Sequence, residues 1–83
     1  MYKLKLTARA KRELKDISKR YKDSISLIFA DLKEDPYLGK PLARELTGKF
    51  SYKVGVFRII YKINRKDKTI LIITAGHRST VYN

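Results

Sequence analysis

The chain has 83 residues, of which 20 are Lys or Arg and 8 are Asp or Glu, so its formal net charge is +12. A chain this short is expected to form one domain over residues 1–83, which excludes barrel enzymes and doubly wound sheets. It has no Cys and one His, which excludes disulfides and Cys nucleophiles and leaves no expected metal site. Its charge predicts a polyanionic partner: nucleic acid, an acidic protein or an anionic membrane surface.

The sequence carries no membrane signal. No segment approaches the roughly 20 apolar residues that cross a bilayer, and residues 1–6 alternate instead of forming the apolar region of a signal peptide. We therefore expect a cytoplasmic protein. The positive charge is uneven, because residues 36–83 hold ten basic and two acidic residues, against ten and six in residues 1–35. This excess places the expected anion-binding surface in the second half.

The first half predicts a strand followed by a helical hairpin. Residues 2–6 alternate with period two, as a strand does, and Thr7 follows as a plausible N-cap. Two apolar stripes at helical spacing then follow: Ala10, Leu14, Ile17, Tyr21, and Ile25, Ile28, Phe29, Leu32. Asp23 or Ser24 is the expected cap of the second helix, and Pro36 requires that helix to stop near the preceding residue.

The second half predicts a loop and three strands. Residues 36–48 hold both prolines and two of the four glycines and are interpreted as a loop, with a short turn near Leu42 and Leu46. Tight connections then separate three apolar segments, residues 49–54, 57–64 and 69–76. The expected fold class is therefore α+β in the order β-α-α-β-β-β. It has a small, antiparallel-rich sheet with the helical hairpin on one face and an open cationic face.

The alternation of side chains in the strands separates a core face from a cationic face. The odd-numbered residues from Phe57 to Ile63 are large and apolar and are expected beneath the helices, which turns Arg58 and Lys62 to the other side. The simplest hairpin register places Lys53 on that same side. Such a face suits a phosphate backbone, because each neutralised phosphate releases counterions. An equally simple interpretation is the solvated face of an amphipathic strand.

The C-terminal residues 76–83 gather groups that suit phosphate chemistry. Arg78 can bind a phosphate through two parallel hydrogen bonds, and His77 and Tyr82 can transfer protons. The last fifteen residues hold no acid, so no carboxylate base is expected there. The alternative roles are structural: His77 satisfying local hydrogen bonds and Tyr82 anchoring the terminus.

Three stretches together resemble the RelE/ParE toxin superfamily. They are a loop with Lys-Pro-Leu and Leu-Thr-Gly in residues 40–48, the strand pair Tyr-Lys-Val-Gly-Val-Phe-Arg-Ile-Ile-Tyr-Lys-Ile in residues 52–63, and the closing His-Arg-Ser-Thr-Val-Tyr of residues 77–82. The resemblance covers nearly the whole chain, and the closing motif favours the RelE branch. The resemblance implies a ribosome-dependent mRNA endoribonuclease. Such an enzyme cuts the codon in the ribosomal A site by attack of the ribose 2′-OH on the adjacent phosphate, without a metal.

The resemblance also implies roles for single residues. It implies that Arg58 stabilises the phosphate in the transition state and that Arg78 binds the scissile phosphate. It also implies that Tyr82 stacks on a nucleobase or helps to activate the 2′-OH, and that Lys53 acts as a general base or as a cation. The further RNA-binding residues expected on this basis are Lys49, Lys62, His77 and Arg44. The chain departs from RelE at Ser51, where a basic residue is expected, and Lys49 is the nearest candidate to compensate.

The expected partners are the ribosome, mRNA and a cognate antitoxin whose acidic or amphipathic segment covers the cationic face. Two other functions stay open. A ParE-like toxin would poison DNA gyrase by binding, and a degenerate toxin would only bind its antitoxin or nucleic acid, which Ser51 favours. The nuclease interpretation requires Arg58 and Arg78 to converge on one phosphodiester.

Overall fold

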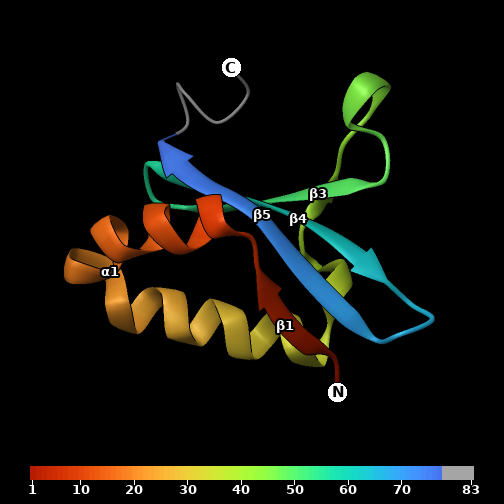
Figure 1. Cartoon of the computed structure of the whole chain (residues 1–83), viewed down its shortest axis with the longest axis horizontal. Coiled ribbons are helices and arrows are strands. Elements are labelled where there is room, and N and C mark those ends of the chain that lie inside the picture. The colour runs from red at the N-terminus through yellow and green to blue at the C-terminus, as the bar shows by residue number, and fades with distance from the viewer. Residues whose placement is uncertain (78–83) are drawn as a thin grey trace.

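The structure is a computed structural model that describes residues 1–77, except for the side chains of residues 18–20 and 77. Figure 1 shows a mixed sheet with a long, bent helix on one side. The elements in chain order are β1 (Lys3–Leu6), α1 (Ala8–Glu34), the 3₁₀ turn η1 (Pro36–Leu38), β2 (Lys40–Pro41), the 3₁₀ turn η2 (Arg44–Leu46), β3 (Lys49–Val54), β4 (Phe57–Asn64) and β5 (Thr69–His77). The expected α+β fold with a helical hairpin against one sheet face is confirmed.

The helical hairpin is α1, which folds back on itself at one residue. Tyr21 leaves the helical region with φ −123° and ψ 24°, and the two arms lie on the same side of the sheet (Figure 1). The break therefore comes before Asp23 and Ser24, which were the expected caps. Thr7 is the N-cap as predicted, since its hydroxyl accepts a hydrogen bond from the Ala10 N–H. The helix ends at Glu34, because Pro36 disfavours helical angles at the residue before it.

The sheet has five strands in the order β1-β5-β4-β3-β2. The expected bounds of β3 and β4 are confirmed, and β5 extends one residue further than predicted, to His77. The interpretation of residues 36–48 as a loop was wrong at β2, whose two residues pair with β3. Pro41 cannot donate a backbone hydrogen bond, which masks a strand in the sequence but is tolerated at the edge of a sheet. The expected short turn before β3 is η2.

The first strand pairs with the last. β1 lies parallel to β5, with Lys5 opposite Leu71 and Leu6 opposite Ile72, whereas all other pairs are antiparallel. A parallel pair needs a long crossover between its strands. The whole of the chain from α1 to β4 supplies it here, and this brings the N-terminal lysines onto the same sheet as the basic residues of β3 and β4.

The core lies between α1 and one face of the sheet. Its largest fully buried side chains are those of Leu32, Ile59, Tyr61, Ile70 and Ile72. Burying each such aliphatic side chain contributes about 1.5–3 kcal/mol. The Tyr61 hydroxyl lies at the end of this core and donates to the Pro36 carbonyl at 2.7 Å while accepting from the Gly39 N–H at 2.9 Å.

Gly39 is required by space, because a Cβ built at this residue would overlap the Tyr61 hydroxyl. The segment from Pro36 to Gly39 is thereby fixed against β4.

Candidate nucleic-acid interface

The face of the sheet opposite α1, called here the outer face, carries its side chains in rows that cross the strands. Because Ile59 and Tyr61 point to the core, their neighbours on β4 point outward. The register then defines three rows. The pocket row is Lys53, Arg58, Gly76; the central row is Lys40, Ser51, Ile60, Thr74; the far row is Lys49, Lys62, Leu71, Lys5.

The pocket row places two cations side by side. Lys53 and Arg58 lie on the same face, as the sequence predicts, and the register places them directly opposite one another on β3 and β4, where such pairs have Cβ atoms about 4.5–5.5 Å apart. Lys53 is exposed, whereas Arg58 is half-buried and its Nε atom is buried. Since an Arg is charged at every physiological pH, the pair presents two positive charges, one of them partly shielded from water.

A β-bulge in β5 sets the third member of this row. Between the pairs Ile60–Thr74 and Tyr61–Ile72 the register shifts, so that Ile73 is an extra residue in β5. The shift turns Ala75 into the core and Gly76 outward, opposite Arg58. Because Gly76 has no side chain, β5 places only backbone opposite Arg58 in this row.

A pocket of about 600 Å³ lies at the pocket row. Its lining includes three cations and two leucines, and the lining residues are Leu38, Lys40, Leu42, Ser51, Tyr52, Lys53 and Arg58. Lys40, Leu38 and Leu42 were not predicted as site residues. They reach the pocket because β2 pairs with β3 and places Lys40 opposite Ser51, and no pattern in the sequence indicates that pairing.

The central row corrects the expectation of a face that is bare throughout. Ser51, Ile60 and Thr74 are 8%, 3% and 4% exposed, although α1 lies on the other side of the sheet. Ser51, where the resemblance leads us to expect a basic residue, is therefore a small, buried residue between two rows of cations. The outer face thus has three buried, uncharged residues in its central row, with the exposed Lys40 at the β2 end of that row and basic rows on either side.

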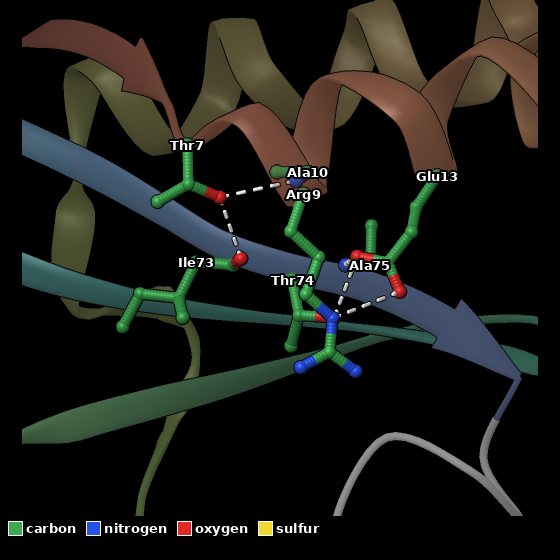
Figure 2. A network of polar contacts seen from close by, with 7 residues as sticks. All are labelled: Thr7, Arg9, Ala10, Glu13, Ile73, Thr74 and Ala75. Carbon is green, nitrogen blue, oxygen red and sulfur yellow. Dashed lines mark hydrogen bonds and ion pairs between the residues drawn. The ribbon is translucent and has the colours of Figure 1, made fainter.

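Side chains from the start of α1 bond to β5 at residues 73–75, where β5 has no neighbouring strand on the β1 side. β1 ends at Leu6, so β5 beyond Ile72 is an edge. Figure 2 shows how the start of α1 covers it: the Thr7 hydroxyl donates to the Ile73 carbonyl at 2.7 Å. Glu13 Oε1 accepts from the Thr74 hydroxyl at 2.7 Å and from the Ala75 N–H at 3.2 Å, and Arg9 pairs with the same carboxylate.

We expect Glu13→Ala to lower the free energy of unfolding by about 1–3 kcal/mol, because the Thr74 hydroxyl and the Ala75 N–H both lose their acceptor. Urea unfolding followed by circular dichroism measures this. Asp16→Ala, which removes an exposed acid from the next turn of α1, is the matched control and should change stability by less than about 0.5 kcal/mol. Equal effects in the two variants would contradict the role given to Glu13.

The structure brings together some of the predicted site residues. Lys53 and Arg58 line the pocket, Lys49 and Lys62 pair in the far row, and Arg44 lies on η2, exposed and outside the pocket lining. Arg78 and Tyr82 lie outside the described residues, and of His77 only the backbone is described, paired with Phe57. Convergence of Arg58 and Arg78 therefore stays a prediction.

The electrostatics of the outer face are one-sided. The residues of the three rows include six cations and no acid: Lys5, Lys40, Lys49, Lys53, Arg58 and Lys62. Among the side chains that the structure describes, no three of His, Cys, Asp or Glu gather as metal ligands do. In the same part of the chain, no helix combines the length and apolar character of a membrane span. A surface of this charge attracts polyanions and raises their local concentration.

The known proteins similar to this chain are described as toxins. Residues 4–82 match the family described as the ParE toxin of the type II toxin–antitoxin system, parDE. The chain is 35% identical to the toxin RelG of Mycobacterium tuberculosis, over 98% of this chain and 95% of RelG. It is 31% identical to the toxin RelE of the same organism, over 98% of this chain and 86% of that toxin.

Solved structures agree with these sequence relations. The crystal structure of the toxin–antitoxin complex RelBE2 from M. tuberculosis contains a chain with TM-score 0.82 and 35% identity, with 93% of this chain and 98% of that chain covered. The isolated E. coli RelE toxin, at 20% identity and TM-score 0.79, covers 99% of this chain and 92% of its own length and shows the same fold.

Proposed function

Because this chain belongs to the RelE/ParE toxin superfamily, and is thus a toxin of a type II toxin–antitoxin system, we propose that it is a ribosome-dependent mRNA endoribonuclease. The proposal places it in the cytoplasm, where it would cut the codon in the ribosomal A site. The observation that carries the proposal is the pocket row, which sets Lys53 directly beside Arg58 at a pocket large enough for a nucleotide.

The proposed reaction is an internal phosphoryl transfer. The ribose 2′-oxygen attacks the adjacent phosphorus and the P–O5′ bond breaks, which leaves a 2′,3′-cyclic phosphate and a 5′-OH. A base takes the proton of the 2′-OH, and an acid returns one to the leaving O5′. Negative charge accumulates on the equatorial oxygens in the transition state, and preorganised donors stabilise it by several kcal/mol.

The residues divide these tasks in the proposal. Arg58 donates to the equatorial oxygens, and its partial burial strengthens that interaction because less water screens it. Lys53 beside it serves as base or second cation. Arg78 binds the scissile phosphate and Tyr82 stacks on a base or helps to activate the 2′-OH, as the resemblance implies. Lys49, Lys62, Arg44 and His77 bind RNA outside the reacting group.

The antitoxin would inhibit by covering the outer face. Some of the solved structures similar to this chain are toxin–antitoxin complexes, among them RelBE2 of M. tuberculosis and RelBE of E. coli. An acidic or amphipathic antitoxin segment would neutralise the basic rows and exclude RNA from the pocket.

The test is cleavage of a defined message by the purified chain, with and without ribosomes stalled at a known codon. Primer extension should show a cut within the A-site codon only when ribosomes are present. The product should end in a 2′,3′-cyclic phosphate. An intact message under both conditions would contradict the proposal.

A second candidate is inhibition of DNA gyrase, and the ParE description of the matching family favours it. A gyrase poison would trap cleaved gyrase–DNA complexes and leave the stalled message whole. The same purified chain, added to supercoiling assays, separates the two functions. A chain that binds antitoxin or nucleic acid but does neither is the degenerate toxin that Ser51 allows.

A further inference from the structure

The far row forms a second basic site, separate from the pocket row. Lys49, Lys62, Leu71 and Lys5 follow one another on β3, β4, β5 and β1 and so cross four strands in one line. The far row lies four residues from the pocket row along both β3 and β4, which corresponds to about 13 Å. On β3, β4 and β5 the buried, uncharged Ser51, Ile60 and Thr74 separate the two.

A second cavity, of about 270 Å³, opens at this row. Lys5 and Lys62 line it, and the half-buried Leu71 lies between them in the row. Ile63 adds a second apolar residue, and Asn64 and Thr69 line the cavity at the end of the β4–β5 hairpin, where their side chains bond to Asp67. Cations beside apolar residues suit a nucleotide, whose phosphate is charged and whose base has an apolar face.

One acid also lines this cavity. Asp67 accepts a hydrogen bond from Asn64 Nδ2 at 3.0 Å, and its own N–H donates to Asn64 Oδ1 at 3.1 Å. The carboxylate is thus engaged in closing the β4–β5 turn. Two lysines against this single acid leave the cavity with a net positive charge.

We propose that the far row and its cavity are a second RNA subsite, which binds a phosphate and base of the message at a distance from the scissile bond. Stacked nucleotides advance about 3.4 Å each and extended ones about twice that, so 13 Å corresponds to about two to four nucleotides. This inference rests on the proposed function. It adds Lys5 to the RNA contacts and gives Lys62 a defined place in them.

Single-stranded RNA fits this site better than a protein segment does. A docked protein segment gains most of its affinity from burying apolar side chains, and the far row and its cavity offer two apolar residues, Leu71 and Ile63. The site instead offers separated positive charges aligned with the pocket row, as a chain of phosphates requires.

The test is binding of fluorescent 2′-O-methyl RNA, which lacks the attacking hydroxyl, in lengths from two to eight nucleotides. Fluorescence anisotropy at several salt concentrations compares the wild type with Lys5→Ala/Lys62→Ala. Wild-type affinity should rise in a step once the RNA reaches about four to six nucleotides, long enough to join the two rows. For longer RNA the double variant should lose the step, and its salt slope should fall by about 1.4, since each phosphate contact to a single strand contributes about 0.7.

The matched control is Lys11→Ala/Lys22→Ala, which removes two exposed lysines of α1, on the other side of the sheet. It should keep the length step. A double variant at Lys5 and Lys62 that binds long RNA like the wild type, or a control that loses as much, would overturn the inference. A wild type that cuts messages on ribosomes but shows no step refutes the second subsite alone. A wild type that neither cuts nor binds RNA refutes the proposed function as well.

Discussion

Arg58→Ala is expected to reduce cleavage of the A-site codon by a factor of about 10²–10³, the loss typical of removing one preorganised transition-state donor. Arg58 lies opposite Lys53 and opposite Gly76, with its Nε atom buried, so no neighbouring side chain of the pocket row can take its place in the same geometry. Primer extension on stalled ribosomes measures the rate, and thermal unfolding reports whether the fold is retained.

Two further variants show whether a loss of cleavage is specific to Arg58 and whether it depends on more than its charge. Arg65→Ala removes an exposed arginine from the β4–β5 turn and should cut at nearly the wild-type rate. Arg58→Lys keeps the positive charge but loses the forked donor geometry, so it should retain only part of the activity. If Arg58→Ala is folded and cleaves as fast as the wild type, Arg58 has no part in the chemistry.

Tyr61→Phe is expected to lower the free energy of unfolding by about 2–4 kcal/mol, because two buried backbone groups lose their partner together. The Pro36 carbonyl and the Gly39 N–H both bind the Tyr61 hydroxyl, and the phenylalanine ring cannot replace it. This is a large share of the about 5–15 kcal/mol that stabilises an ordinary domain. Urea unfolding measures the change.

Tyr37→Phe is the matched control, because the Tyr37 side chain is half exposed and its ring contact with Phe50 survives the change. It should be nearly neutral. Equal unfolding midpoints for Tyr61→Phe and the wild type would show that the junction from Pro36 to Gly39 is not stabilised by this hydroxyl. That junction contains Leu38 and is followed by Lys40, both of which line the pocket, so the Tyr61 hydroxyl also holds this part of the pocket lining in place.

The same tyrosine predicts a dependence on alkaline pH. Burial raises the pKa of Tyr61 above its ordinary value of 10.0. Below pH 10 the hydroxyl is protonated in both the folded and the unfolded chain, and its stabilisation is complete. As the pH rises past 10, the unfolded chain releases this proton first, so the folded state loses stability. The stability difference between the wild type and Tyr61→Phe should therefore shrink above pH 10, and urea unfolding at pH 8 and at pH 10.5 checks it. A constant difference would contradict it.

Much of the fold follows from local patterns. The alternation in residues 49–64 predicts both strands, their core faces and the placement of Lys53 on the same face as Arg58, because a two-residue turn leaves one simple register. The stripe spacing predicts both arms of α1 but misplaces the break. Helical spacing tolerates a shift of a few residues, and the position of Tyr21 depends on its contacts, which include the ring of Phe57 in β4.

The amino-acid sequence by itself determined the class of fold, the basic character of the protein and which strand residues face away from the helices, because side-chain alternation and charge are local properties. Only the tertiary structure decided which of those residues lie together. The parallel pairing of β1 with β5 brings Lys5 into line with Lys62, the bulge at Ile73 turns Gly76 toward Arg58, and Glu13 closes an edge 61 residues away in the chain. Pairings between distant segments depend on how the whole core packs, and no short stretch of sequence encodes them.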